Sequence, residues 1–223
     1  MERSAWLDER LAAVEAEYDA EAPTYDEDPY PVETQRRFVA RLLETCPDDG
    51  LVLDAPCGTG QYFPQVASAG RRVVGIDRSA GMLAQARARD IAVDLHHVGL
   101  REMAFEHAFD AVMTIDAMEN VPPEDWPAVL ANLHRAARPG AHLYLTVEEV
   151  AEDVIDEAFR ALTALGLPAV HGEVIEGDVA GYHYYPGRDR VSDWLASERL
   201  RIVQQDTQDL DGWSYWHLLL RAG

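Results

Sequence analysis

The feature that most constrains the fold is a regular alternation of short apolar runs and helical patterns, which begins at residue 51. Apolar runs occupy residues 51–53, 73–76, 91–95, 109–115 and 142–147. Strands that are apolar on both faces are typical of a parallel sheet that helices cover on both sides. The sequence therefore predicts an α/β fold with a doubly wound, Rossmann-like sheet.

The C-terminal part of the chain departs from this alternation. Two apolar runs, 200–203 and 213–220, are separated by a turn-rich connection over 204–212. That connection is too short for a crossover helix, so the two runs should pair as antiparallel strands. We therefore expect a seven-stranded sheet whose last strand is antiparallel to the first five.

Two further regions flank this core. Helical spacing predicts helices over 4–19 and 32–46, and an insertion after the fifth strand contains a helix over 151–165, an extended segment over 171–186 and a short helix around Trp194. A chain of 223 residues suits one domain. We expect a single domain over 1–223, made of an N-terminal helix and lid (1–31), a cofactor-binding core (32–147), a substrate-side insertion (151–199) and a C-terminal hairpin (200–223).

The charge of the chain argues against polyanionic partners. Forty Asp and Glu residues oppose nineteen cationic residues, all of them Arg, which gives a net charge of -21. A field of this sign repels nucleic acid backbones and anionic membranes. No apolar run is long enough to span a bilayer, and the first residues do not resemble a signal peptide.

The two cysteines, Cys46 and Cys57, stand in unlike contexts, which suits a reducing compartment. We expect a cytoplasmic monomer or homodimer that binds neither nucleic acid nor membrane. The absence of Lys and the abundance of Ala and Arg point to a GC-rich bacterial genome.

An acid stands at the end of three predicted strands: Asp54, Asp77 and Asp116. Open doubly wound sheets bind ligands at the carboxyl ends of their strands. We therefore expect these acids to surround the ligand site.

The loop after the first strand carries Gly58 and Gly60, which permit a tight turn and a close approach of a ligand to the backbone. A dinucleotide fingerprint would place a third glycine at Phe63, and Asp54 would repel a pyrophosphate at this loop. A ligand with an ammonium group and a ribose fits better, because Asp54 can hold the ammonium and Asp77 the ribose hydroxyls. S-adenosylmethionine carries both groups and no phosphate.

The segments 52–60, 74–83, 109–113 and 138–140 follow one another in an order that resembles the successive motifs of class I S-adenosylmethionine-dependent methyltransferases of the small-molecule type. The resemblance implies the strand order 3-2-1-4-5-7-6 and a transferase that leaves S-adenosyl-L-homocysteine as its product. It implies cofactor-binding roles for Asp54, Ala55, Gly58, Gly60, Tyr62, Asp77, Arg78, Met82, Gly99, Leu100, Ile115, Asp116 and Ala117.

One position departs from that pattern. The loop after the third strand usually carries a Gly-Asp pair whose acid accepts from the adenine amino group, whereas this chain has Gly99-Leu100. We expect backbone groups, Glu102 or another acid to replace that contact.

The insertion supplies the candidate substrate residues. A Tyr and His cluster over 182–185 suits the stacking of a flat ligand, and ordinary lid packing is the alternative. His183 has an unperturbed pKa that suits a general base, so it is the predicted catalytic residue. Tyr18 and Tyr25 resemble lid tyrosines of the family. The predicted substrate-binding residues are Tyr18, Tyr25, Tyr182, Tyr184, Tyr185 and Glu148, and no metal site is expected, because the histidines lack ligand spacing.

The sequence thus predicts transfer of a methyl group to an oxygen or nitrogen of a small molecule. A non-catalytic module that only binds S-adenosylmethionine is one alternative. An NAD-dependent oxidoreductase is a weaker one, because Asp54 and Phe63 oppose a dinucleotide.

Overall fold

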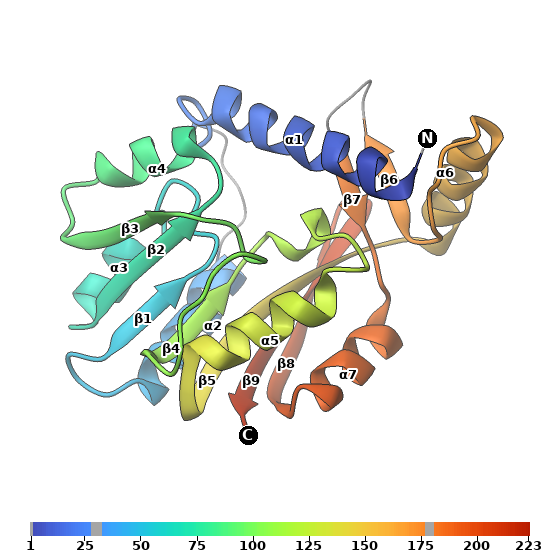
Figure 1. The fold of residues 1–223 in the computed structure, drawn as a ribbon. Coiled ribbons are helices and arrows are strands. Elements are labelled where there is room, and N and C mark those ends of the chain that lie inside the picture. The colour runs from blue at the N-terminus through green and yellow to red at the C-terminus, as the bar shows by residue number, and fades with distance from the viewer. Residues whose placement is uncertain (1, 28–32, 177–180) are drawn as a thin grey trace.

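The structure, a computed structural model, describes residues 2–27, 33–176 and 181–223. Seven of the strands in these ranges form one sheet in the order β3-β2-β1-β4-β5-β9-β8 (Figure 1). The first five are parallel, and β9 runs antiparallel to both of its neighbours, which confirms the predicted fold class. These strands are β1 (Leu51–Asp54), β2 (Arg72–Asp77), β3 (Val93–His97), β4 (Phe109–Thr114), β5 (Ala137–Val150), β8 (Leu200–Leu210) and β9 (Trp213–Ala222).

Helices cover both faces of the sheet. On one face pack α2 (Glu33–Thr45), α3 (Phe63–Ser68) and α4 (Ala80–Arg87), and on the other pack α5 (Trp126–Ala136) and α7 (Arg188–Ser197). Neighbouring strand residues alternate between the two cores: Val52 joins the first and Leu53 the second, and both are fully buried. This burial on two sides explains why the strands are continuous apolar runs.

Two predicted boundaries are wrong. The turn-rich connection expected over 204–212 is mostly strand, because β8 continues to Leu210 and the hairpin turns at Asp211 and Gly212. The polar residues of this segment lie on an edge strand, where they can face solvent. A register shift between Ile202 and Gln204 leaves Val203 exposed. The third strand also begins two residues later than expected, at Val93.

The insertion contains α6 (Glu152–Ala164) and an antiparallel hairpin of β6 (Glu173–Glu176) and β7 (Gly181–Tyr184). The extended segment expected over 171–186 is thus a hairpin, of which residues 177–180 lie outside the described ranges. In Figure 1 the hairpin stands beside the N-terminal end of α1 (Arg3–Glu21).

Helix α1 crosses the carboxyl edge of the sheet and is tied down near both ends (Figure 1). Near its start, Arg3 forms an ion pair of 2.8 Å with Glu173 of β6. Near its end, Asp19 accepts hydrogen bonds from the Ser79 hydroxyl at 2.6 Å and the Gly81 amide at 2.8 Å, at the beginning of α4. The helix therefore forms a roof over the strand ends.

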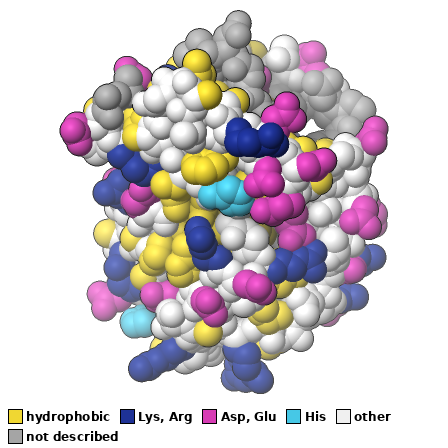
Figure 2. Space-filling model, turned by 90° about the vertical axis from the view of Figure 1, so that its right-hand side faces the viewer, with side chains coloured by type: hydrophobic (Ala, Val, Ile, Leu, Met, Phe, Trp, Pro, Cys, Tyr) yellow, Lys and Arg dark blue, Asp and Glu magenta, His cyan; other side chains and the backbone are white. Residues whose placement is uncertain are grey.

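The surface reflects the acidic composition. Acidic side chains are spread over the face seen in Figure 2, with arginine side chains among them. None of the helices in the described ranges is long and apolar enough to cross a membrane. Both cysteines are buried, and neither forms a disulfide.

Candidate functional site

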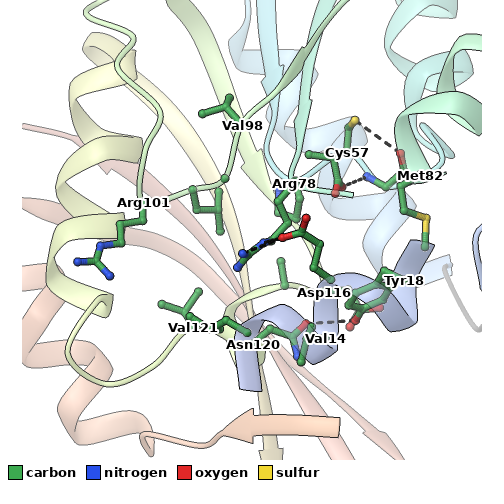
Figure 3. Close-up of a pocket in the computed structure, with 18 of the residues that line it drawn as sticks. Val14, Tyr18, Cys57, Arg78, Met82, Val98, Arg101, Asp116, Asn120 and Val121 are labelled. Carbon is green, nitrogen blue, oxygen red and sulfur yellow. Dashed lines mark hydrogen bonds and ion pairs between the residues drawn. The ribbon is translucent and has the colours of Figure 1, made fainter. Parts of the chain in front are cut away.

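A cavity of about 340 Å³ lies between the carboxyl edge of the sheet and α1 (Figure 3). Its volume is within the range of roughly 300–1,000 Å³ that is usual for small-molecule sites. The roof consists of residues of α1 and the following turn, and the floor consists of the loops after β1, β2, β3 and β4. Of the predicted cofactor residues, those that line it are Gly58, Tyr62, Asp77, Arg78, Met82, Gly99, Leu100, Ile115, Asp116 and Ala117.

The glycine loop after β1 is built for close approach. Gly58 and Gly60 have positive φ angles of 51° and 75°. A Cβ on Gly58 would meet nothing within 4 Å, so this part of the backbone is open to a ligand. A Cβ on Gly60 would lie 2.5 Å from the Phe63 ring. Phe63 stands where a dinucleotide loop has its third glycine, and its ring packs against Gly75 of β2. The helix and the strand therefore approach closely through a glycine of the strand and not through a glycine of the helix.

Asp54 ends β1 beneath the cavity floor. It is 1% exposed, and its Oδ2 atom has no hydrogen-bond partner among the residues that the structure describes. Burial, and secondarily the charge of Asp77, raises the pKa of Asp54. A buried carboxylate oxygen without a partner suits a ligand that brings a positive charge or a donor, directly or through water. Ala55 and Gly60, also predicted as cofactor residues, support the loop from below and are not among the lining residues.

Asp77 ends β2 at the cavity wall and is 7% exposed. Its Oδ2 accepts from the Gly58 amide at 2.9 Å, and its Oδ1 accepts from the Ser79 amide at 2.8 Å. Burial raises the pKa of Asp77, and these hydrogen bonds oppose that shift. The Ser79 side chain caps α4 by accepting from the Met82 amide at 3.0 Å. One turn of chain therefore fixes both Asp77 and Met82 beside the cavity.

Leu100 occupies the position where an adenine-binding acid was expected. It lines the cavity, and its carbonyl accepts from the Asn132 side chain at 2.9 Å. Two acids line the cavity near it, Glu102 and Asp125. Asp125 also forms an ion pair of 3.1 Å with Arg101. Sequence reasoning named Glu102 as a substitute and missed Asp125, which only the packing of α5 against this loop brings close.

The end of β4 carries a cluster of carboxylates. Asp116 has a positive φ of 54°, its amide donates to the Thr146 hydroxyl at 2.7 Å, and burial raises its pKa to about 7. Carboxylate oxygens of Asp116, Glu119 and Glu148 all lie within 4.8 Å of one another. Burial, followed by the charges of Asp116 and Glu148, raises the pKa of Glu119.

This cluster joins three elements: the end of β4, the 3₁₀ helix η1 (Met118–Asn120) and β5. The sequence predicted a cofactor role for Asp116 and a substrate role for Glu148, but not that their side chains meet Glu119. The spacing of Asp116 and Glu119 after a strand end was the available signal, but the approach of Glu148 depends on the sheet register.

Two tyrosines of the roof face the strand ends. Tyr18 and Tyr25 both line the cavity, and their rings meet edge to face at 6.2 Å. The Tyr18 hydroxyl donates to Asn120 Oδ1 at 3.1 Å, which ties the roof to η1 (Figure 3). Burial raises the pKa of both phenols, so both remain neutral donors at physiological pH.

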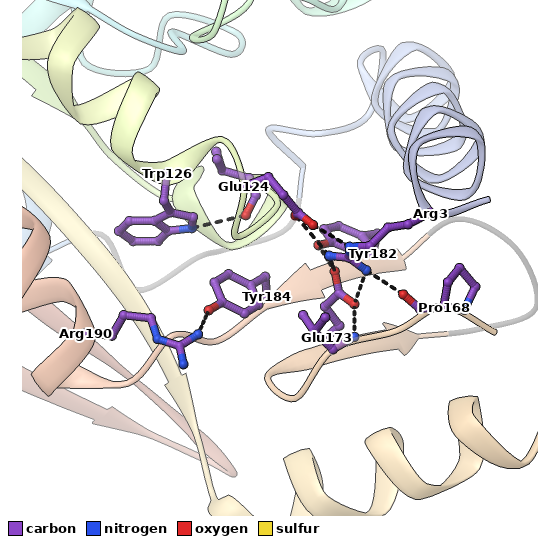
Figure 4. Close-up of polar contacts among 10 residues, drawn as sticks. Arg3, Glu124, Trp126, Pro168, Glu173, Tyr182, Tyr184 and Arg190 are labelled. Carbon is purple, nitrogen blue, oxygen red and sulfur yellow. Dashed lines mark hydrogen bonds and ion pairs between the residues drawn. The ribbon is translucent and has the colours of Figure 1, made fainter. Parts of the chain in front are cut away.

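The tyrosines of the insertion lie elsewhere. Tyr182 and Tyr184 are almost fully buried, and their hydroxyls bind Glu173 at 2.7 Å and the Arg190 guanidinium at 2.6 Å (Figure 4). His183 contacts the Tyr185 hydroxyl at 3.1 Å. Within the described ranges, the cavity lining includes none of these four residues, nor Glu148. Their contact with an acceptor stays a prediction.

Comparison with known proteins agrees with this geometry. The family model for the methyltransferase domain matches residues 52–140. A ubiquinone biosynthesis O-methyltransferase of Hahella chejuensis is 36% identical over 101 residues, which are 43% of this chain and 42% of that protein. A demethylmenaquinone methyltransferase of Renibacterium salmoninarum is 28% identical over 208 residues, 86% of this chain and 85% of that protein. The chain thus spans less than half the length of the first of these relatives.

Among solved structures, the 1,6-didemethyltoxoflavin-N1-methyltransferase of Burkholderia thailandensis superposes with a TM-score of 0.72 at 15% identity, covering 100% of this chain and 91% of that one. The match shows a shared fold. The strand order, the acids at the ends of β1 and β2 and the family match agree. Together they support a class I S-adenosylmethionine-dependent methyltransferase, with the methyltransferase domain matched over residues 52–140.

Proposed function

We propose that the protein transfers a methyl group from S-adenosyl-L-methionine to an oxygen or nitrogen atom of a small-molecule acceptor. The observation that carries this proposal is the pair of buried carboxylates, Asp54 and Asp77, on either side of the open glycine loop. This arrangement suits a ligand with an ammonium group and a ribose, and it disfavours a pyrophosphate.

The residues of the cavity fit this cofactor. Asp77, oriented by two backbone amides, would take the ribose hydroxyls, and Met82 would pack against the adenine. Asp116 and the backbone after β4 would meet the amino-acid end. When bound, the cofactor supplies a methyl group that its sulfonium already activates.

The chain's own contribution is chiefly positioning. Because the methyl group is already activated, catalysis requires that an acceptor atom is held in line with it and that water is kept out. The roof of α1, tied to η1 through Tyr18 and Asn120, serves that purpose. A base is required only for a hydroxyl acceptor, and His183 is the residue we propose for it.

The acceptor would lie beneath the roof, in contact with Tyr18 and Tyr25, toward the side of the insertion, where the other predicted substrate residues lie, Tyr182, Tyr184, Tyr185 and Glu148. Relatives named for ubiquinone biosynthesis and for demethylmenaquinone, and a structural neighbour named for 1,6-didemethyltoxoflavin, support a screen of phenols, quinols and nitrogen heterocycles as acceptors. We further propose that residues 1–223 act as one cytoplasmic domain, as a monomer or homodimer, without nucleic acid.

Calorimetric titration of S-adenosylmethionine and S-adenosylhomocysteine tests the cofactor site. We expect micromolar binding by the wild type and a loss of at least about a hundredfold in Asp77→Ala, because a charge-assisted bidentate contact disappears. The matched control is Asp94→Ala, since Asp94 lies on the neighbouring strand β3 with a 71% exposed side chain. Absence of binding by folded wild type would refute the proposal.

Turnover separates an enzyme from a module that only binds. Formation of S-adenosylhomocysteine with one acceptor of the screen supports the enzyme, whereas tight cofactor binding without turnover of any acceptor supports the module. Unchanged turnover in His183→Ala, with unchanged cofactor affinity, would remove His183 from the mechanism. Tight NAD binding in place of S-adenosylmethionine would favour an oxidoreductase.

A further inference from the structure

Three side chains tie the turn after the roof helix to the glycine loop. Asp26, in the turn that follows α1, accepts from the Thr59 hydroxyl at 2.7 Å. Arg89, just beyond the end of α4, donates to the same hydroxyl at 3.0 Å and also to the Thr59 carbonyl. Arg89 forms an ion pair with Asp26 as well. Each of the three side chains therefore binds the other two, and we call Asp26, Thr59 and Arg89 the clasp.

The clasp holds a part of the chain that shapes the cofactor site. Thr59 stands between Gly58 and Gly60, whose positive φ angles belong to a backbone that glycine alone leaves free to move. The Gly58 amide donates to Asp77 at 2.9 Å, so the turn that the clasp holds also orients this carboxylate. Tyr25, the neighbour of the clasp in the chain, lines the cavity from above. The clasp thus connects the wall of the cavity to its roof.

A second aspartate of the roof has a similar arrangement. Asp19 follows the cavity residue Tyr18 and accepts from the Ser79 hydroxyl and the Gly81 amide. The bond from Ser79, followed by that from Gly81, lowers the pKa of Asp19. The Ser79 amide also donates to Asp77 at 2.8 Å. Each roof tyrosine is therefore followed by an aspartate that binds a loop of the cofactor site.

Burial distinguishes the clasp from an ordinary surface ion pair. Arg37 and Asp206 form such a pair at 2.7 Å, with side chains that are 50% and 49% exposed. Pairs of this kind contribute little to stability. In the clasp, the aspartate is half exposed, but the Arg89 side chain is 25% exposed and Thr59 only 2%. If Arg89 moved away, buried polar atoms of Thr59 would lose a partner, which is costly. The clasp therefore favours the arrangement in which the roof turn meets the loop.

We propose that Asp26 and Arg89 are positioning residues of the cofactor site, which hold Tyr25 and the glycine loop in the arrangement that encloses the cofactor. They act through Thr59, which lines the cavity, whereas neither of them is among its lining residues in the described ranges. Because a ligand beneath the roof leaves when the roof turn separates from the loop, the clasp sets the rate of that release. This inference rests on the proposed binding of S-adenosylmethionine in the cavity.

Calorimetry and stopped-flow displacement of S-adenosylhomocysteine test this role. In Asp26→Asn and in Arg89→Gln the affinity should fall about five- to tenfold, chiefly through faster dissociation, because the loop and the roof turn must then be ordered during binding. The double variant should bind no more weakly than the weaker single variant, because both side chains act through one network. Arg89→Lys should lie between the wild type and Arg89→Gln, since an ammonium group lacks the fork of donors that reaches both partners.

The matched control is Arg37→Gln, which breaks an Arg–Asp pair between two other elements, α2 and β8. Its dissociation rate should equal that of the wild type. Urea denaturation should give each clasp variant a midpoint near that of the wild type, so that faster release is not a result of unfolding.

Two results would overturn the inference while the wild type still binds S-adenosylhomocysteine. One is a wild-type rate of release in Arg89→Gln, whatever its urea midpoint, and the other is an additive loss of affinity in the double variant. Absence of S-adenosylhomocysteine binding by the folded wild type would instead refute the proposed function, and this inference with it.

Discussion

The cavity floor and the β6–β7 hairpin both bury acids, but they treat them differently. In the hairpin, the fully buried Glu173 accepts from the Arg3 guanidinium, the Tyr182 hydroxyl and the Val170 amide. In the floor, Asp54 and Glu119 are buried to a similar degree, yet each keeps one carboxylate oxygen without a hydrogen-bond partner in the described part of the chain. Figure 4 shows the contacts around Glu173, and Figure 3 shows the open cavity.

We interpret this difference as one between acids that stabilise the fold and acids that are available to a ligand. A buried charge that serves stability must be paired within the chain, because an unpaired one costs several kcal/mol. In a site that binds a cationic ligand, the ligand itself supplies the partner of the acid, and without the ligand the pKa of the buried acid is raised. Glu173 and Asp54 therefore differ in whether their carboxylate oxygens have partners within the chain, and not in how deeply they are buried.

The largest expected effect concerns the glycine loop of the floor. Gly60→Ala combines a positive φ with a Cβ at 2.5 Å from the buried Phe63 ring, so we expect a loss of about 4 kcal/mol in the free energy of unfolding. The control is Gly70→Ala, since Gly70 has a similar φ of 72° but no atom within 4 Å of its Cβ position. It should lose about 1–2 kcal/mol in urea denaturation. Equal losses would show that Phe63 yields and that the loop is not tightly packed.

This loop also shows what the sequence could predict. Between residues 51 and 147, the glycines, the acids at strand ends and the apolar runs act through local geometry. Their spacing in the sequence was therefore enough to predict the fold and most of the residues that line the cavity. The cluster at 182–185 does not work in this way. Tyr182 and Tyr184 alternate with His183 along β7. The Tyr182 hydroxyl donates to Glu173, which in turn pairs with Arg3, a residue far away in the sequence. Only the tertiary packing of α1 decides which face of the hairpin is structural.

The next effect tests the paired acid of the hairpin. Arg3→Ala leaves the buried Glu173 carboxylate without its main counter-charge, so we expect a loss of about 3 kcal/mol in the free energy of unfolding. Glu124→Gln is the control, since Glu124 is half-exposed and its pair with Arg3 should contribute less than about 1 kcal/mol. Adding Glu173→Gln to Arg3→Ala should recover part of the loss in a double-mutant cycle. An additive result would refute the coupling.

The unpaired acid of the floor should behave in the opposite way. Asp54→Asn removes a buried carboxylate with an unsatisfied oxygen, so without ligand we expect a gain of about 1–2 kcal/mol at neutral pH, together with at least tenfold weaker S-adenosylmethionine binding. The pKa of Asp54 is raised in the folded state, so the folded protein binds more protons than the unfolded one. The wild type should therefore lose stability relative to Asp54→Asn as the pH rises above about 4. Thermal melts from pH 4 to 8 measure this, and a variant less stable than wild type throughout would contradict it.

The smallest effect concerns the adenine end of the floor, where the expected acid is replaced by Leu100. Glu102 and Asp125 both line the cavity there, but Asp125 already pairs with Arg101, so we expect Glu102 to accept from the adenine amino group. Glu102→Gln keeps an acceptor oxygen and loses only the charge, so the affinity for S-adenosylhomocysteine should fall about fivefold, near 1 kcal/mol. The analogue in which hypoxanthine replaces adenine lacks the amino donor, so its affinity should not change in this variant. If Asp125→Asn instead weakens binding of S-adenosylhomocysteine and leaves binding of the hypoxanthine analogue unchanged, the adenine amino group donates to Asp125, at the start of α5, and not to Glu102.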